Sequence, residues 1–358
     1  MRRAASAYID LAALGHNLTQ ARRSAPHSRV VAMVKADAYG HGLLNVAAYL
    51  AGRADALGVA CVPEALALRE AGIPGRILVT QGFKNEDELQ AASSQELDVV
   101  VHEAHQLALL ENANSRRLPG LWIKVDSGMH RLGFVPERLP QVHAALMKLN
   151  GLPRPPGFVT HFACADEPGH PLSATQLQRF DSAVAELEGE HSMANSAAVL
   201  SLPTAHRDWV RPGIMLYGSS PLLQTSAAEL DLRPVMSLRA PLIAINRHRR
   251  GESVGYGATF TCPEDMPVGV VAIGYGDGYP RHAGTGTPVA VNGVRAVLAG
   301  RVSMDMLTVD LREVGAQVGD EVEFWGRSVA VDEVARHAQT ISYELLCNAG
   351  SRSPKVYL

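Results

Sequence analysis

The chain has 358 residues, of which 47% are hydrophobic and 19% are charged, so it is long enough for more than one ordinary domain and for a large core. This excludes a single small binding module and a disordered chain. The 33 basic and 36 acidic residues give a net charge of -3, and no run of Lys or Arg is long enough to follow a phosphate backbone. Nucleic acid is therefore not an expected partner.

The four cysteines, Cys61, Cys164, Cys262 and Cys347, are far apart and form no CxxC pair. We expect reduced, mostly buried thiols, with neither a metal site nor a disulfide framework. The start of the chain carries two arginines but no apolar signal region, and no apolar stretch is long enough to cross a bilayer. These patterns predict a cytoplasmic protein without a membrane partner.

Short apolar, β-branched runs alternate with helical patterns from residue 30 to about residue 218. The runs are RVVAMVK, ALGVA, RILVTQG, DVVVH, LWIKVD, GFVTHF, HSMAN and WVRPGIMLYG. Stretches between them, such as ATQLQRFDSAVAELEG, repeat apolar residues at the helical spacing of three and four. Eight strands, each followed by a helix, predict an α/β fold of the (β/α)8 barrel type, with a doubly wound open sheet as the alternative.

After about residue 230 the pattern changes to Val-rich runs broken by Gly and Pro. They include PLIAINR, GVVAIGYG, PVAVNG, AVLAG and EVEFWG, with one helical segment near VDEVARHAQ. We therefore expect a barrel over residues 1–230 and a mainly β domain over residues 231–358.

Polar residues at the ends of the barrel strands are candidates for the chemistry, because barrel active sites lie at that end. Lys35 ends the first run and Tyr39 follows it in a Gly-flanked loop, which is the placement that a Schiff-base lysine requires. Ser196 and the backbone amides near Gly213 and Ile214 follow the last two strands, where barrels commonly hold a phosphate. A lysine and a phosphate cradle indicate pyridoxal phosphate, although a sugar-phosphate aldolase would present both and Lys35 could be a surface charge.

Eight motifs follow one another between residues 34 and 306: VKADAYGHG, KVDSGMHRLG, THFACAD, NSAA, RPGIMLYG, VGYGATF, GYGDGYPR and GRVSMD. Together they resemble the alanine racemase family, and the resemblance covers essentially the whole chain. It implies a pyridoxal-phosphate-dependent isomerase that interconverts L-alanine and D-alanine, either to supply D-alanine for peptidoglycan or to degrade alanine. It also implies a head-to-tail homodimer in which the C-terminal β domain completes the partner subunit's active site.

Racemisation at an α-carbon needs an electron sink and two bases, one on each face. Lys35 resembles the family lysine that holds the cofactor and serves the D-enantiomer. Tyr256 in VGYGATF resembles the tyrosine that serves the L-enantiomer from the partner subunit. A phenol is a poor base at neutral pH unless nearby cations favour the phenolate, so this role requires a positive environment. The residues alone would equally suit an aromatic that caps a Gly-rich bend.

The same resemblance assigns the remaining cofactor contacts. Arg211 matches the arginine that faces the pyridine nitrogen, and since a guanidinium only donates, that nitrogen should stay unprotonated. His161 would donate to Arg211 or help polarise it, or would be a satisfied core histidine. The cofactor phosphate would be held by Tyr39, Ser196 and the backbone at Gly213 and Ile214.

For the substrate carboxylate, the matches are Arg131 and the backbone at Met304; an arginine suits a planar carboxylate through two parallel hydrogen bonds. Lys124 matches a lysine that is often carboxylated in this family, whereas the residues alone would let it point outward or pair with Asp126. The residues that resemble the family's substrate access corridor, and that could also be surface groups, are Asp166, Tyr275, Arg281 and Arg301.

The sequence departs from the family pattern at Ser351, where some members have a tyrosine near the phosphate region. Cys347, in the same stretch, is expected to be a packed thiol. Two other enzyme classes remain open, a broader-specificity amino-acid racemase and a pyridoxal-phosphate amino-acid decarboxylase, which also pairs a barrel with a β domain. VGYGATF and the Arg211 strand argue against the decarboxylase, and the β-rich C-terminal half argues against a non-catalytic cofactor-binding barrel.

Overall fold

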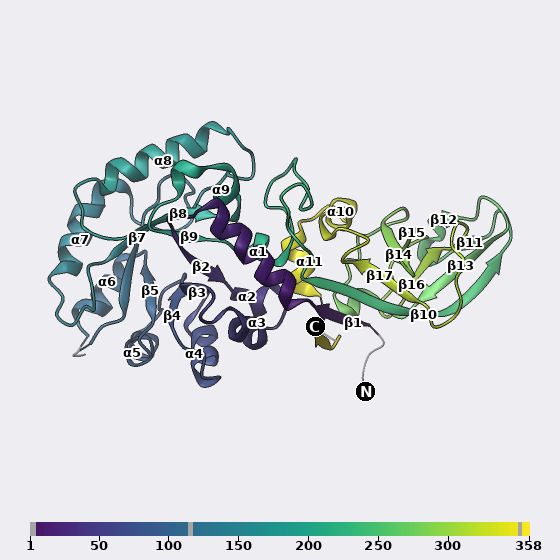
Figure 1. The fold of residues 1–358 in the computed structure, drawn as a ribbon, viewed down its shortest axis with the longest axis horizontal. Helices are drawn as coiled ribbons and strands as arrows, with labels where there is room; N and C mark the ends of the chain where they lie inside the picture. The colour runs from purple at the N-terminus through teal and green to yellow at the C-terminus, as the bar shows by residue number, and fades with distance from the viewer. Residues whose placement is uncertain (1–4, 114–116, 350–352) are drawn as a thin grey trace.

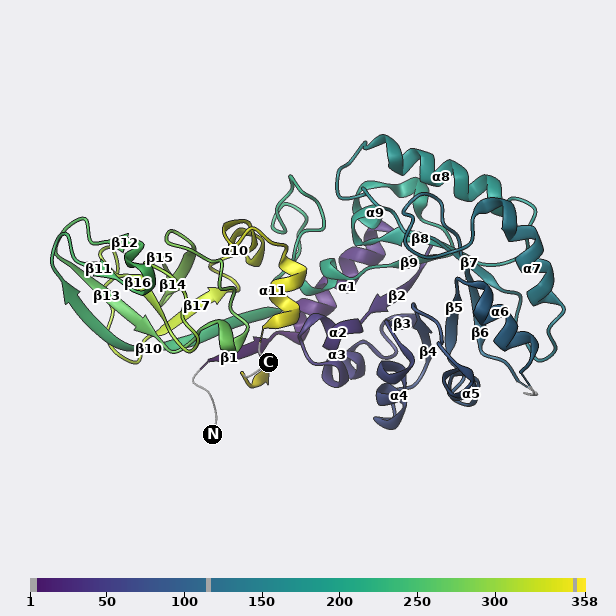
Figure 2. The same cartoon turned by 180° about the vertical axis from the view of Figure 1, so that it is seen from behind.

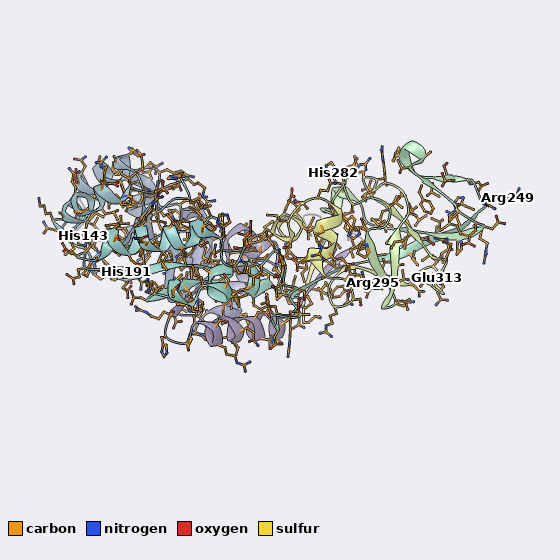
Figure 3. The ribbon with its side chains drawn as sticks, turned by 90° about the horizontal axis from the view of Figure 1, so that it is seen from above. His143, His191, Arg249, His282, Arg295 and Glu313 are labelled. Carbon is orange, nitrogen blue, oxygen red and sulfur yellow. The ribbon has the colours of Figure 1, made fainter. Side chains whose placement is uncertain are left out.

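The computed structural model describes residues 5–113, 117–349 and 353–358. These parts of the chain form two lobes, which we call the barrel lobe and the sheet lobe (Figure 1). Figure 3 places His143 and His191 in the barrel lobe and Arg249 at the far tip of the sheet lobe. The long strand β10 (Met236–His248) runs outward from the junction of the two lobes.

Eight parallel strands in the described part of the chain close into a barrel. They are β2 (Arg29–Met33), β3 (Ala56–Val59), β4 (Arg76–Val79), β5 (Asp98–Val101), β6 (Gly120–Lys124), β7 (Gly157–Val159), β8 (His191–Asn195) and β9 (Trp209–Arg211). The barrel closes where Arg29 and Val30 of β2 pair with Trp209 and Val210 of β9. This confirms the predicted (β/α)8 fold, and the open-sheet alternative is wrong.

Helices surround the barrel because each buries an apolar face against the strands. They are α1 (Leu11–Ser24), α3 (Leu43–Leu50), α4 (Val62–Glu70), α5 (Glu86–Ser94), α6 (Ala104–Glu111), α7 (Leu139–Met147), α8 (Pro171–Val184) and α9 (Ser196–Ser201). The short segment α2 (Lys35–Tyr39) has left-handed backbone and is a turn. Short 3-10 turns are η1 (Pro136–Arg138), η2 (Pro203–Ala205) and η3 (Ile214–Tyr217).

The expectation that a helix follows every barrel strand is wrong at β9, which leads into η3. The helix that covers this position is α1, from the start of the chain, which contacts η3, α3 and α9. Asn17 of α1 fixes the arrangement, because its side chain donates to the carbonyl oxygens of Leu216 and Arg233 over 3.0 and 2.8 Å. Buried Ala13, Leu14 and Leu18 have the spacing of an inward helix face.

The amino-terminal end of the barrel is sealed by aromatic and charged side chains. The Arg76 guanidinium lies 4.6 Å from the Trp209 ring and 5.5 Å from the Trp122 ring. Asp98 accepts hydrogen bonds from Arg76 and Trp122 over 2.5 and 3.0 Å. The carboxyl-terminal end of the barrel strands is thus the end that can hold a binding site.

The sheet lobe contains an eight-stranded sheet among the described residues, in the order β13-β16-β15-β14-β17-β10-β1-β18. Besides β10 its strands are β1 (Ser6–Ile9), β13 (Met266–Val271), β14 (Pro288–Val291), β15 (Val294–Leu298), β16 (Leu307–Asp310), β17 (Glu321–Trp325) and β18 (Lys355–Tyr357). A small hairpin adds β11 (Ser253–Val254) and β12 (Phe260–Thr261), and the 3-10 turns are η4 (Tyr256–Ala258) and η5 (Tyr275–Asp277). The first and last strands of the chain lie side by side here, with β1 parallel to β18.

Two helices in the described part of the sheet lobe correct the prediction of one helical segment. The predicted one is α10 (Val331–His337); the other is α11 (Ser342–Asn348), which lies beside α2 between the two lobes (Figure 2). Seven residues give too short a pattern to stand out as a helix in the sequence.

The cysteines are less buried than expected. Cys262 is buried, Cys61 and Cys164 are partly exposed and Cys347 is exposed, each as a free thiol. Cys347 differs because it sits on the cavity-facing side of α11. Within the described ranges, no helix is both long and apolar enough to cross a membrane.

Gly40 marks a tight contact between the lobes and gives a first prediction. Its φ is 80°, and a Cβ built there would lie 1.9 Å from the Leu346 carbonyl oxygen of α11. We expect Gly40→Ala to lower the free energy of unfolding by about 1–3 kcal/mol more than Gly52→Ala, because overpacking adds to the cost of a left-handed alanine. Gly52 is the matched control, with φ 74° and nothing within 4 Å. Equal losses in chemical denaturation would contradict the tight contact.

Candidate active site

A cavity of about 480 Å³ opens at the carboxyl end of the barrel strands. It brings together nine of the residues that the sequence singled out. They are Lys35, Tyr39, Lys124, Arg131, His161, Ser196, Arg211, Gly213 and Ile214.

Lys35 lies two residues after the end of β2, the first barrel strand, and opens α2. Residues 36–39 of α2 have φ values of 53–54°, which makes this a left-handed turn built without glycine. Such backbone costs L-residues about 1–2 kcal/mol each, so the surrounding structure must hold it. Burial, followed by the charges of Arg131 and Arg211, lowers the pKa of Lys35 below its ordinary value. The unprotonated amine that a nucleophile or base needs is thus favoured.

Hydroxyl and amide groups converge in the same cavity. The Ser196 hydroxyl accepts a hydrogen bond from the Gly213 amide over 2.7 Å, and η3 begins with Ile214. A Cβ built on Gly213 would lie 2.3 Å from the Tyr39 hydroxyl, so glycine is required for this close approach. Burial raises the pKa of Tyr39, which keeps its hydroxyl protonated as a donor. Such a set of donors suits a phosphate.

Arg211 ends β9 and is buried beneath the cavity. Its guanidinium donates to the Ser192 hydroxyl and the Thr160 carbonyl, both over 2.6 Å. Although burial lowers the pKa of Arg211 to about 10, the group stays charged at neutral pH.

His161 lies beside Arg211 as a neutral ring. Burial, followed by the charges of Arg211, Lys124 and other cations, holds the pKa of His161 well below its ordinary value. Its Nδ1 lies 3.4 Å from the Arg211 Nη2, and its Nε2 lies 3.4 Å from the amide nitrogen of Asn195. The expectation that His161 donates to Arg211 is wrong, because a guanidinium has no acceptor; the neutral ring accepts through one nitrogen.

Lys124 ends β6 and lines the cavity, so the alternative of an outward side chain is wrong. Asp126 is engaged elsewhere, since its carboxylate accepts from the His130 backbone amide over 2.9 Å and lies 3.0 Å from the His130 ring. Burial, followed by the charges of Arg211 and Arg131, holds the pKa of Lys124 well below its ordinary value. The cavity therefore gathers basic side chains and lacks a matching cluster of acids among its described lining residues.

The candidate residues of the sheet lobe lie outside this cavity within a single chain. Tyr256, Tyr275 and Met304 are 67%, 41% and 54% exposed. The turn that carries Tyr275 lies beside Met304, because the Gly276 amide donates to the Met304 carbonyl over 2.9 Å. The turn that carries Tyr256 lies near Arg301, since a Cβ built on Gly255 would be 3.8 Å from the Arg301 backbone nitrogen. The Arg301 guanidinium lies against the η4 turn, since a Cβ built on Gly257 would be 3.1 Å from its Nη1.

Two other predicted corridor residues also lie outside the cavity lining. Arg281 is exposed in the loop after η5, and Asp166 is half-buried in the loop after β7. The charge of Asp166 contributes to raising the pKa of Tyr343, after burial, to about 12. Ser351 lies outside the described residues.

Sequence reasoning missed Tyr343, which lines the cavity from α11. Its ring centroid lies 6.1 Å from that of Tyr39. No strand end precedes it, so the rule that placed the other residues could not find it. Cys347 of the same helix also lines the cavity, and burial raises the pKa of its thiol, which disfavours a nucleophilic thiolate.

Two protein-family models match most of the chain. The model described as alanine racemase, N-terminal domain, matches residues 9–221. The model described as alanine racemase, C-terminal domain, matches residues 235–357.

Proteins named alanine racemase are similar to this chain over nearly its whole length. The chain is 53% identical to an alanine racemase of Thioalkalivibrio sulfidiphilus over 354 residues, which is 98% of each chain. It is 50% identical to one of Nitrosococcus oceani over 350 residues, again 98% of each. The crystal structure of a biosynthetic alanine racemase from Pseudomonas aeruginosa superposes with a TM-score of 0.96 at 48% identity, covering 100% of both chains. That of Acinetobacter baumannii alanine racemase gives a TM-score of 0.94 at 40% identity, covering 99% of this chain and 100% of the other.

Proposed function

The chain belongs to the alanine racemase family and interconverts L- and D-alanine, and from this premise we propose how its residues divide the work. Lys35 holds pyridoxal phosphate and acts as one base. Tyr256 of the partner subunit acts as the other. The observation that carries the proposal is the cavity itself, which gathers an amine with a lowered pKa, a set of phosphate donors and a buried guanidinium.

The described residues fit pyridoxal phosphate. The Tyr39 and Ser196 hydroxyls and the backbone at Gly213 and Ile214 suit the phosphate, and the space at Gly213 that a Cβ would fill is closed by the Tyr39 hydroxyl. The Lys35 amine, favoured in its neutral form, suits the aldehyde. When bound, the cofactor supplies an electron sink for the α-carbon of the amino acid.

Lys35 and Tyr256 then move the α-proton on opposite faces. The Lys35 Nζ takes the proton from D-alanine, while the Tyr256 hydroxyl of the partner subunit delivers one from the other side; the roles reverse with L-alanine. Arg131 and Arg211 line the cavity that this phenol would enter, and cations favour a phenolate.

Arg211 sets the electronic character of the cofactor. We place its guanidinium at the pyridine nitrogen. Because the guanidinium stays charged and only donates hydrogen bonds, the pyridine nitrogen should remain unprotonated. An unprotonated ring is a weaker electron sink. The hydrogen bonds from Arg211 to Ser192 and Thr160 hold the guanidinium in the cavity, which supports this role.

Arg131 and the Met304 backbone of the partner subunit bind the substrate carboxylate in this proposal. Lys124 carries a carbamate. Its neutral amine, favoured by the lowered pKa, adds to carbon dioxide with loss of one proton, and the resulting anion accepts hydrogen bonds from Arg131. The carbamate thus replaces repulsion between two cations by attraction.

The second prediction tests this carbamate. Lys124→Ala should lower kcat/KM for alanine by about 10–100-fold, because the carboxylate-binding arginine is left unsupported, and millimolar acetate should restore part of it. Exposed Lys148 gives the matched control, Lys148→Ala. A carbamate signal should appear in carbon-13 NMR of the protein with labelled bicarbonate and vanish in Lys124→Ala alone. A fully active enzyme whose signal is absent would contradict the assignment.

The homodimer is supported by the exposed face of the sheet lobe. Tyr256, Tyr275 and Met304 are large apolar or aromatic groups left open to solvent on adjoining turns, as is typical of an interface. We propose that residues 231–358 of one subunit bring this face over the cavity of the other. Asp166, Tyr275, Arg281 and Arg301 would then line the access corridor.

The D-alanine produced is proposed to feed peptidoglycan synthesis, as suits a chain 48% identical to the biosynthetic Pseudomonas enzyme. The decarboxylase alternative is not favoured, because both family models and the relatives above are alanine racemases. Purified protein loaded with pyridoxal phosphate should convert L-alanine to D-alanine without releasing carbon dioxide. Release of carbon dioxide without D-alanine would overturn the proposal.

A further inference from the structure

The left-handed turn that carries Lys35 needs external support. Inside the turn, the Ala38 amide donates to the Val34 carbonyl over 2.9 Å and the Gly40 amide donates to Ala36 over 3.0 Å. These bonds alone do not favour the left-handed form over a right-handed one, since non-glycine residues resist positive φ. The contacts around the turn therefore decide where the Lys35 side chain points.

The barrel supplies one set of contacts. The Glu64 carboxylate accepts from the Ala36 amide over 2.8 Å and from the Ala60 amide over 2.7 Å. The Tyr39 ring stacks on Tyr217 at 4.6 Å. Both contacts tie the turn to the barrel lobe.

The last strand of the chain supplies a second set from the other side. The Lys355 Nζ lies 3.0 Å from Oδ2 of Asp37, inside the turn, while Oδ1 of Asp37 accepts from the Leu43 amide over 2.7 Å. The Tyr357 hydroxyl donates to the His41 carbonyl over 3.1 Å. The Asp37 carboxylate thus bridges the turn, the start of α3 and β18.

Gly42 shows how closely β18 approaches the backbone that follows the left-handed turn. A Cβ built on Gly42 would lie 1.9 Å from the Tyr357 hydroxyl and 3.3 Å from Cδ of Lys355. The backbone at Gly42, with φ 95°, therefore makes room for both side chains of the last strand.

The strand that makes these contacts is itself anchored. It pairs in parallel with β1, and the Ala7 amide donates to Pro354 over 3.0 Å while the Leu358 amide donates to Ile9 over 2.9 Å. Since β1 also pairs with β10, the support reaches into the eight-stranded sheet.

We propose that Lys355 and Tyr357 are positioning residues for Lys35: from the last strand of the chain they hold the left-handed turn, through Asp37 and the His41 carbonyl, in the conformation that directs Lys35 into the cavity. Neither side chain lines the cavity. This inference rests on the role of Lys35 in the proposed function. The conformation of the turn is therefore measured independently of enzyme activity.

The test compares Lys355→Met, Tyr357→Phe and the double variant with Lys355→Arg, all in the cofactor-loaded enzyme. The matched control is Arg239→Met, which removes ion pairs of similar exposure in the same sheet. The partners of Arg239 are Glu321, 2.9 Å away, and Glu323, 3.7 Å away. We expect the double variant to lower kcat about tenfold in both directions with KM changed less than about twofold, because a misplaced base acts on the reaction and not on binding. Lys355→Arg should keep most of kcat, and Arg239→Met should keep all of it.

Hydrogen exchange of residues 36–43, read by mass spectrometry, supplies the measurement that is independent of activity. Exchange there should rise about tenfold or more in the double variant, whereas exchange in the β-strands of the barrel should not change. Unchanged exchange at the turn, or an equal loss of kcat in Arg239→Met, would overturn the proposal. If Lys35→Ala stayed active while hydrogen exchange of the turn still rose in the double variant, the proposed role of Lys35 would be wrong. The conclusion that Lys355 and Tyr357 stabilise the turn would still hold.

Discussion

Replacing Lys35 with alanine is expected to lower racemisation by about 10⁴-fold or more in both directions, the upper end of what loss of a general base costs. The variant should also lose the visible absorption that pyridoxal phosphate shows when it is joined to a lysine. Of the five lysines in the sequence, Lys35 and Lys124 line the cavity, and only Lys35 lies in the turn that follows the first barrel strand.

Lys148→Ala is the matched control for this variant, because it removes an exposed lysine from the end of α7. It should keep the absorption and the activity. A Lys35→Ala protein that still held its cofactor in a linkage reducible by borohydride would show that another residue carries it.

The second large effect is expected from Tyr256→Phe, and it should be asymmetric. Uptake of solvent deuterium at the α-carbon should fall by about 10²–10⁴-fold when L-alanine is the starting enantiomer, because the base on that face is lost. Exchange with D-alanine should fall much less, since Lys35 still serves the other face.

Initial rates of deuterium uptake, measured separately for the two enantiomers, check this asymmetry. Tyr49→Phe, which changes a tyrosine of α3 far from the exposed face around Tyr256, is the control and should leave both rates unchanged. Equal losses from the two enantiomers in Tyr256→Phe would refute the division of the two faces between the two bases.

The barrel and its mouth could be predicted from the sequence because local rules apply to them. Runs such as DVVVH and LWIKVD became β5 and β6, buried on both sides as parallel strands are. Lys35 was found because it follows the first barrel strand, and a closed barrel brings such positions to one opening. Lys124 and Arg211 came from the family resemblance, and the structure shows that each ends a barrel strand.

The remainder depends on contacts between distant parts of the chain. The sequence of Ala36, Asp37 and Ala38 does not predict a left-handed turn, since residues with a Cβ favour negative φ. The contacts around this turn come from residues distant in sequence, such as Glu64 and Lys355. Tyr343 enters the cavity because α11 packs beside α2, about 300 residues away in sequence. The pairing of β1 with β18 is equally non-local.

The most direct test of the shared active site is to mix the two inactive variants. One subunit carries Lys35→Ala and the other carries Tyr256→Phe, so a heterodimer would have one site with both bases intact. After complete subunit exchange at equal amounts, half of the dimers are mixed and each has one intact site of two, so about a quarter of the unsubstituted activity should return. No recovery after exchange has been confirmed by native mass spectrometry would contradict a site built from Lys35 of one subunit and Tyr256 of the other.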